Sequence, residues 1–298
     1  MGLHRIFGAL GILMSCSVGA TAQTQTPPAP APAATPSQPS TVDQDVQKRR
    51  REQMRGPDSR IINGIPAAPG RWPFAVAFAE PSDGGKLTQY CGGSVISDRW
   101  ILTAAHCLVA KTDKVILGRS NLTGGDGEVI GIVEVIQHPS YNKDAHDSDV
   151  ALVRLERATR QKPVALARDG FSPPKTATAI GWGLMQEKGT PSDRLLQIDI
   201  PVIDNNTCAS LYKASGTAIT ANMVCAGAIG MDTCQGDSGG PLSVVNPDTG
   251  ADVVVGVVSF GIGCARPGYL GVYSRVSRFA KWIETKTGVK PGAKTASK

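Results

Sequence analysis

Short runs of strand-forming residues, repeatedly interrupted by Gly and Pro, limit what this chain can fold into. Such runs occupy residues 74–78, 129–135 and 253–258, and many of the 34 Gly and 21 Pro separate them. Strands of this length and spacing are typical of an all-β protein. Residues 277–287 depart from the pattern, because their apolar side chains recur at a helical period. We predict a single amphipathic helix there.

The charge of the chain is modest once its N-terminal part is set aside. The 298 residues have a formal net charge of +6, and residues 1–60 hold seven of the 31 basic and four of the 25 acidic residues. The remainder therefore carries +3, without a cluster of Arg on one segment. A small, scattered excess indicates a solvated surface, so we expect no nucleic-acid partner. The apolar content suffices for one large domain or two small ones.

The N-terminus has the pattern of an export signal. The apolar run 6–14 leads through small residues to Ala20-Thr21-Ala22, which predicts a signal peptide over residues 1–22. This run is too short for a permanent membrane span, so we expect a secreted protein, extracellular or periplasmic. Residues 13–16 loosely resemble a bacterial lipidation box, which leaves a lipid anchor on Cys16 as the minority alternative.

Residues 23–60 differ in composition from the rest of the chain. Residues 23–40 are almost entirely Pro, Ala, Thr, Gln and Ser, a composition that predicts a disordered linker. Residues 43–60 are charged and read as a solvated pro-segment. The globular pattern begins at Ile61 and continues to residue 287, and the Lys-rich tail 288–298 has the composition of a disordered end.

Removal of the leader leaves six cysteines, an even number, which implies disulfide bonds in an exported chain. Their spacing contains no C-x-x-C unit, so we expect no metal site. Sequence spacing alone leaves 15 possible pairings open. The six are Cys91, Cys107, Cys208, Cys225, Cys234 and Cys264.

The pentad from Gly236 to Gly240 surrounds Ser238 with glycines. Such a tight turn can expose a hydroxyl nucleophile and leave backbone N–H groups free to bind an oxyanion. By itself the pentad is equally typical of a turn between strands, and it also fits the G-x-S-x-G nucleophile elbow of α/β-hydrolases. That fold needs a histidine after the serine, whereas the last histidine here is His146. The base must therefore precede Ser238.

Three histidines of the mature chain precede Ser238. His106 adjoins Cys107, and a disulfide there could hold it on a rigid turn, whereas His138 and His146 read as turn and loop residues. A carboxylate must then accept the Nδ1 proton of the base. Asp149 begins an apolar run and can be partly buried, whereas Asp144 and Asp147 read as solvated. We predict His106 as the base and Asp149 as its partner.

Residues 102–107, 149–152 and 236–241 resemble the three signature blocks of the chymotrypsin family of trypsin-like serine endopeptidases. The similarity extends over about residues 61–287. It implies two packed six-stranded antiparallel β-barrels with a C-terminal helix, and a catalytic triad in the cleft between the barrels. It also implies that no cofactor takes part.

The resemblance assigns a role to each residue of the triad. Ser238 attacks the scissile carbonyl, His106 takes its proton, Asp149 orients the imidazole, and an acyl-enzyme forms. The N–H groups of Gly236 and Ser238 stabilise the oxyanion. The family also implies three disulfide pairs, namely Cys91 with Cys107, Cys208 with Cys225, and Cys234 with Cys264.

Specificity and activation also follow from the resemblance. Asp232 matches the acidic residue at the base of a pocket for Arg or Lys, with Ser259, Gly261 and Gly271 lining it, although Phe260 replaces the usual Trp. Arg60-Ile61 resembles a zymogen cleavage site, after which the Ile61 amine would pair with Asp237. Partners are then protein or peptide substrates with Arg or Lys before the scissile bond, and protein inhibitors of proteases. We expect a monomer.

The loop 118–129 departs from the family pattern. Arg119 replaces the first carboxylate of the loop 118–129, which corresponds to the calcium loop of trypsin, so we expect no calcium requirement. A catalytically inactive relative that binds ligands in its cleft is one alternative, although all three triad residues are present. An adhesin anchored through Cys16 is another.

Overall fold

The computed structural model describes residues 64–81, 86–111, 113–184, 190–264 and 268–292. The expected signal peptide, the Pro-rich linker, Cys16 and the cleavage site Arg60-Ile61 lie outside these residues, as does the end of the tail.

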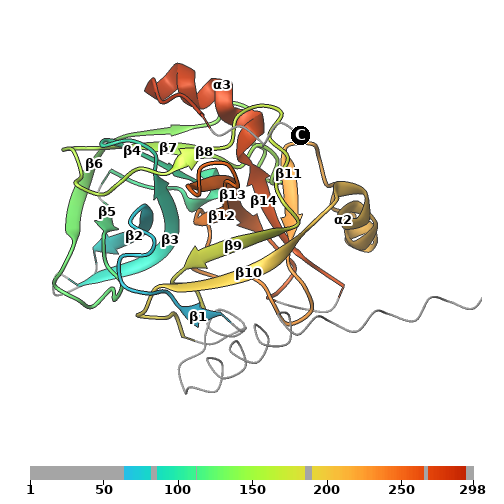
Figure 1. Cartoon of the computed structure of the whole chain (residues 1–298), viewed down its shortest axis with the longest axis horizontal. Helices are drawn as coiled ribbons and strands as arrows, with labels where there is room; N and C mark the ends of the chain where they lie inside the picture. The colour runs from blue at the N-terminus through green and yellow to red at the C-terminus, as the bar shows by residue number, and fades with distance from the viewer. Residues whose placement is uncertain (1–63, 82–85, 112, 185–189, 265–267, 293–298) are drawn as a thin grey trace, which may run out of the picture. The chain divides into compact units, whose positions relative to one another are not determined.

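The first half of the described part of the chain forms a closed barrel of six antiparallel strands, in the order β2-β3-β4-β7-β6-β5 (Figure 1). Its interior is apolar, with Val76, Phe78 and Leu102 fully buried. Closure leaves no exposed sheet edge in the ring, which removes a route to aggregation. The strands are β2 (Ala75–Pro81), β3 (Leu87–Val95), β4 (Trp100–Thr103), β5 (Lys114–Leu117), β6 (Glu128–Gln137) and β7 (Ala151–Leu155).

The second half also closes into a ring of six antiparallel strands, in the order β10-β11-β14-β13-β12-β9, with β9 returning to β10. Two short strands extend it: β1 (Ile65–Pro66) pairs with β10, and β8 (Ala165–Leu166) runs parallel to β13. The ring consists of β9 (Thr176–Gly181), β10 (Leu196–Ile203), β11 (Met223–Ala226), β12 (Pro241–Val245), β13 (Asp252–Phe260) and β14 (Gly271–Arg275).

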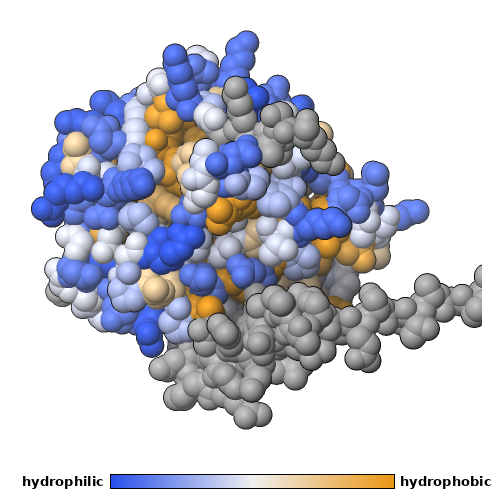
Figure 2. All heavy atoms as spheres, viewed as in Figure 1, coloured by the Kyte–Doolittle hydropathy of each residue, from blue (hydrophilic) through white to orange (hydrophobic). Residues whose placement is uncertain are grey.

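The all-β prediction, with two six-stranded barrels, is confirmed. The three runs of strand formers that the sequence analysis singled out fall in β2, β6 and β13. Seen from the side shown in Figure 1, the described surface is largely hydrophilic, and apolar residues show mainly toward the middle of this face (Figure 2). The two barrel interiors hold most of the buried apolar side chains.

The predicted C-terminal helix is α3 (Val276–Thr287), which begins one residue earlier than expected. Phe279 and Ile283 bury its apolar side, and the ring of His138 packs edge-on against Phe279. Gly288 ends the helix in the left-handed conformation. No helix in the described part of the chain is both long and apolar enough to cross a bilayer.

Helix α2 (Asn205–Tyr212), which precedes the turn η3 (Lys213–Ser215), was not among the elements predicted from the sequence. Asp204 caps α2, because its carboxylate accepts hydrogen bonds from the N–H groups of Asn206 and Thr207. The Cys208–Cys225 disulfide joins this helix to β11. The other two disulfides join Cys91 with Cys107 and Cys234 with Cys264, so the three pairs are those that the resemblance implies.

Candidate active site

His106 lies on the short 3₁₀ turn η2 (Ala105–Cys107), which follows β4. The Cys91–Cys107 disulfide ties this turn to β3, and Leu108 ends it with a left-handed backbone at φ 49°. The imidazole therefore projects from a short turn that follows β4 directly and that a disulfide joins to β3. This is the rigid setting that the neighbouring cysteine suggested.

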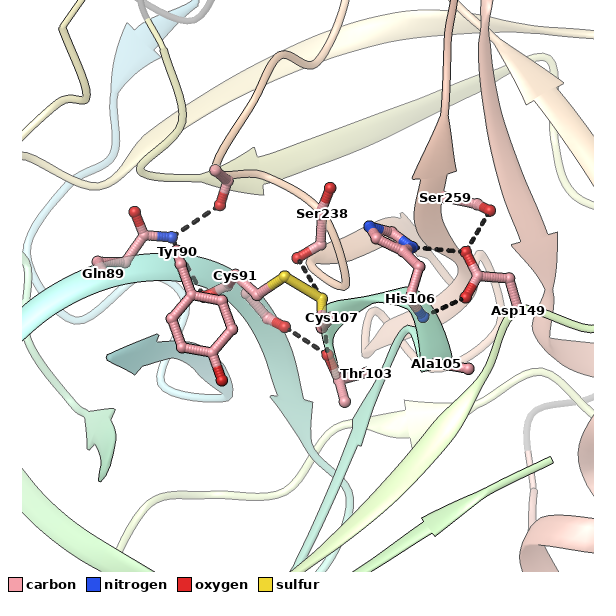
Figure 3. The surroundings of a disulfide bond; sticks show 12 residues. Gln89, Tyr90, Cys91, Thr103, Ala105, His106, Cys107, Asp149, Ser238 and Ser259 are labelled. Carbon is pink, nitrogen blue, oxygen red and sulfur yellow. Dashed lines mark hydrogen bonds and ion pairs between the residues drawn. A yellow bond between two sulfur atoms is a disulfide. The ribbon is translucent and has the colours of Figure 1, made fainter. Parts of the chain in front are cut away.

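Asp149 is fully buried two residues before β7 begins, and both of its carboxylate oxygens bond to His106. Oδ2 lies 2.7 Å from Nδ1 of the ring, and Oδ1 accepts a hydrogen bond from the backbone N–H of His106 at 2.9 Å (Figure 3). Burial by itself would raise the pKa of Asp149, but the hydrogen bond and charge of His106 outweigh it, so the pKa is lowered. The carboxylate remains ionised and fixes the direction of the ring.

Two serines of the second barrel also bond to Asp149. The hydroxyl of Ser259 donates to Oδ2 at 2.5 Å, and that of Ser274 donates to the backbone carbonyl at 2.8 Å. The sequence analysis assigned Ser259 to the substrate pocket. Ser259 does line that pocket, but its hydroxyl bonds to the carboxylate of Asp149.

Ser238 lies in the turn before β12, and the first barrel holds its backbone. Gly92 N–H donates to its carbonyl at 2.6 Å, and Sγ of Cys107 lies 3.6 Å from the same oxygen. Gly239 follows with φ 78°, and a Cβ there would lie 2.2 Å from Oγ1 of Thr103. Only glycine fits this turn, because both the backbone conformation and the space exclude a side chain.

The imidazole of His106 lies between Asp149 and Ser238 (Figure 3). Asp149 is hydrogen-bonded to the imidazole of His106. The described residues include no hydrogen bond between the Ser238 hydroxyl and His106. Catalytic hydrogen bonds are often long or poorly aligned without substrate and tighten in the complex. The structure thus brings all three predicted residues together and joins two of them directly.

Asp237 is fully buried and accepts hydrogen bonds from Gly183 N–H at 2.8 Å and Cys234 N–H at 3.0 Å. A Cβ on Gly181 or Gly183 would come within 2.1 Å or 2.4 Å of its oxygens, so both neighbours must be glycine. Burial raises the pKa of Asp237 to about 6, although these backbone donors oppose the shift. Its expected partner, the amine of Ile61, lies outside the described residues.

The four predicted pocket residues line one pocket together with Ser238; they are Asp232, Ser259, Gly261 and Gly271. Asp232 is 5% exposed and accepts a hydrogen bond from the N–H of Thr233 at 2.8 Å. Burial, followed by the charge of Asp232, raises the pKa of Tyr273. A nearly buried carboxylate therefore lines the same pocket as the candidate nucleophile.

Sequence reasoning missed two residues beside the site. His146 adopts φ 50°, and its ring stacks on Phe260 with centroids 4.9 Å apart. Asp147 was read as solvated, but it is half-buried and accepts hydrogen bonds from Thr220 and Asn222, which lower its pKa against the effect of burial. Thr220 and Asn222 lie more than 70 positions away, so no local pattern could have indicated these two partners.

The loop 118–129 contains a cation in its interior. Arg119 donates from Nε to the carbonyl of Asp126 at 2.7 Å and from Nη1 to that of Leu122 at 2.9 Å. Elsewhere in the described residues, the cluster of Cys91, His106 and Cys107 has metal-like spacing, but both cysteines are in a disulfide and offer no thiolate.

Comparisons with known proteins agree with this architecture. The sequence model of the Trypsin family matches residues 61–283. Trypsin of Saccharopolyspora erythraea is 38% identical over 227 residues, covering 74% of this chain and 94% of the relative. Trypsin eta of Drosophila erecta is 35% identical over 242 residues, covering 77% of this chain and 91% of the relative.

A longer relative contains the same region as one part. The serine proteinase stubble of Drosophila melanogaster is 34% identical over 248 residues, which cover 76% of this chain but 31% of the relative. The double barrel and these similarities define a trypsin-like serine-type endopeptidase. The chain belongs to the trypsin family.

Proposed function

We propose that the chain is a secreted endopeptidase precursor that hydrolyses peptide bonds after Arg or Lys, with Ser238, His106 and Asp149 as its triad. The observation that carries the proposal is the pairing of both Asp149 oxygens with His106 beside Ser238. Such a buried carboxylate fixes the imidazole tautomer whose Nε2 can accept a proton.

In the proposed reaction His106 takes the Ser238 proton as the hydroxyl attacks the scissile carbonyl. Asp149 stabilises the imidazolium that forms, and the backbone N–H groups of Gly236 and Ser238 bind the oxyanion. The imidazolium then protonates the leaving amine, and water hydrolyses the acyl-enzyme by the same steps in reverse order. The reaction uses only groups of this chain and water.

The preference for Arg or Lys is supported by the pocket beside Ser238. Asp232 is nearly buried in it, and a carboxylate in such a place favours a ligand that carries a positive charge. Gly261 and Gly271 leave room for a long side chain. Two relatives that are named trypsin match the chain over more than nine-tenths of their own length.

We further propose that cleavage between Arg60 and Ile61 activates the precursor. Asp237 is a buried carboxylate, and the described residues provide it with backbone donors but no cation within ion-pair distance. A new amine at Ile61 would supply one, and the resulting pair would order the neighbouring oxyanion loop. Arg60 itself suits the proposed pocket, so self-activation is part of the proposal.

The remaining elements of the proposal come from the sequence. Residues 1–22 would be the signal peptide, 23–60 the linker and pro-segment, 61–287 the peptidase domain and 288–298 a disordered tail. Export to the periplasm or the exterior, monomeric state and inhibition by protein inhibitors belong to the same proposal.

A peptide library tests the proposal, incubated with the purified precursor before and after cleavage at Arg60. We expect cuts after Arg and Lys only in the cleaved form, and none with Ser238→Ala. Cleavage without preference for basic residues would contradict the pocket assignment. A Ser238→Ala precursor that still matures alone in pure form would exclude self-activation.

A further inference from the structure

The side chain of Gln89 reaches from the first barrel to the loop that contains Gly236. Its Nε2 donates to the carbonyl of Gly236 at 2.7 Å and to that of Cys91 at 3.1 Å (Figure 3). Gln89 is half-buried, and 147 positions separate it from Gly236. The sequence analysis gave it no role.

The two carbonyls fix the orientation of the Gln89 amide. Only the NH₂ group can donate to both of them, because Oε1 in the same place would face two other oxygens. Oε1 is itself buried and has no hydrogen-bond partner among the described residues. Leaving a buried acceptor unsatisfied is unfavourable, so the two bonds donated by Nε2 are what hold the amide in this position.

A β-bulge directs Gln89 toward the second barrel. Along β2 and β3, Phe78 pairs with Cys91 and Ala79 pairs with Gln89, which leaves Tyr90 as an extra residue. Bulges bend a strand and redirect its side chains, and they are frequent beside active sites. Tyr90 then bonds to Asp113 at 2.7 Å, and Gln89 turns to the loop. The direction of Gln89 is thus built into the strand.

Gly236 needs such support on both sides, because it adopts φ 93° and glycine rotates easily. The peptide before it is held by Leu184 N–H, which donates to Gln235 O at 2.7 Å. Since C=O and N–H point in opposite directions across a peptide, this bond directs the Gly236 N–H away from Leu184. The peptide between Gly236 and Asp237 is held at both ends. Gln89 donates to its carbonyl, that of Gly236, and its N–H, that of Asp237, donates to Cys234 O within the loop.

We propose that Gln89 is a positioning residue for the oxyanion hole. By holding the Gly236 carbonyl it fixes the peptide that follows Gly236 and limits rotation about this glycine, so that the Gly236 N–H points at the oxyanion before substrate arrives. The inference rests on the proposed function of the site. A donor that is already oriented stabilises charge that appears only in the transition state. Loss of Gln89 should therefore lower turnover and leave ground-state binding in the Asp232 pocket intact.

Two variants of the protein cleaved after Arg60 test this role. Gln89→Met keeps the length of the side chain and removes the donor, and Gln89→Glu places a carboxylate against two carbonyl oxygens. We expect kcat to fall about tenfold in Gln89→Met, which is less than the ~10²-fold to 10³-fold loss of an oxyanion donor itself. The kcat of Gln89→Glu should fall further than that of Gln89→Met. Inactivation by a fluorophosphonate should slow by the same factors, whereas the Kd of benzamidine stays unchanged.

Gln197→Met is the matched control, because it removes a glutamine hydrogen bond of similar length, from Trp72 Nε1 at 2.8 Å, without touching the oxyanion loop. It should keep the wild-type kcat. Wild-type kcat in both Gln89 variants would overturn this inference and leave the proposed function standing. A fall in kcat that is matched by weaker benzamidine binding would do the same. A cleaved wild-type protein that neither hydrolyses Arg substrates nor reacts with the fluorophosphonate would overturn the proposed function and this inference with it.

Discussion

The hydroxyl of Ser259 donates a hydrogen bond to the carboxylate of Asp149, on the same oxygen that faces His106. Ser259 belongs to β13 of the second barrel, whereas Asp149 precedes β7 of the first. The bond therefore connects the two barrels at the residue that orients the imidazole. Both groups are buried, so water does not compete for the interaction.

Ser259→Ala should lower kcat about tenfold, because a hydrogen bond to a buried charge contributes on the order of 1.5–3 kcal/mol and only part of it is specific to the imidazolium state. KM for an Arg substrate should change little. Steady-state kinetics check this, with Ser274→Ala as control, since that hydroxyl bonds to the Asp149 backbone and not to its carboxylate. A higher KM with unchanged kcat would instead make Ser259 a substrate contact.

Local signals in the sequence, together with the family resemblance, selected the three residues of the candidate triad. His106 has a cysteine beside it, Asp149 precedes an apolar run, and Ser238 lies among glycines. Each signal reflects a local need: a rigid turn, a buried carboxylate and an exposed hydroxyl. The strand runs likewise predicted barrel strands, but the two-residue strands β1 and β8 carry no periodic pattern.

Contacts between distant segments could not be predicted in the same way. Ser259 is 110 positions from Asp149, and Gln89 is 147 positions from Gly236. A serine in a strand and a glutamine before a cysteine have many uses, and only the packing of the two barrels selects one. Helix α2 did carry a readable signal, the capping Asp204, which the sequence analysis passed over.

Asp232→Ser should abolish cleavage after Arg and leave the triad reactive. The buried carboxylate is the group in this pocket that can pair with a substrate cation, whereas Ser238 and His106 keep their own partners. Peptide hydrolysis and labelling by a fluorophosphonate measure the two effects separately. Undiminished cleavage after Arg would refute the pocket assignment.

Gly271→Ala should reduce kcat/KM for Arg substrates about 10²-fold, the loss that misplacement by roughly 1 Å can cause. The new Cβ would lie 2.6 Å from Oδ1 of Asp232, so the carboxylate must move. Gly125→Ala is the control, because nothing lies within 4 Å of a Cβ there. Similar activity in the two variants would show that Asp232 does not need its present position.

Chelation should leave the Tm of the protein unchanged. Arg119 bonds to the carbonyls of Leu122 and Asp126, and a cation there repels a divalent ion. Glu128 is engaged as well: burial would raise its pKa, but Thr159 and Arg157 lower it to about 2. Thermal unfolding with EDTA and with added Ca²⁺ checks the expectation. A marked fall in Tm on chelation, reversed by Ca²⁺, would contradict it.

The buried carboxylate of Asp237 should make the uncleaved precursor less stable as the pH rises from about 4 to about 6. Its pKa is about 6 in the folded state against 3.8 for the unperturbed group, so the folded form binds more protons in this range. Stability therefore falls with rising pH, by about 3 kcal/mol in total at 1.36 kcal/mol for each pKa unit. Asp149 has a lowered pKa and contributes a trend of the opposite sign.

A difference measurement isolates this contribution of Asp237. Urea unfolding of the Ser238→Ala precursor, with and without Asp237→Asn, gives two free energies at each pH, and the other carboxyl groups cancel between them. We expect the free energy of unfolding of the Asp237→Asn variant to rise relative to that of the parent as the pH rises from 4 to 6. After cleavage at Arg60 this rise should disappear, because the Ile61 amine then neutralises the carboxylate. A difference that is independent of pH in the precursor would show that Asp237 already has a compensating cation before cleavage, and the proposed activation would lose its physical basis.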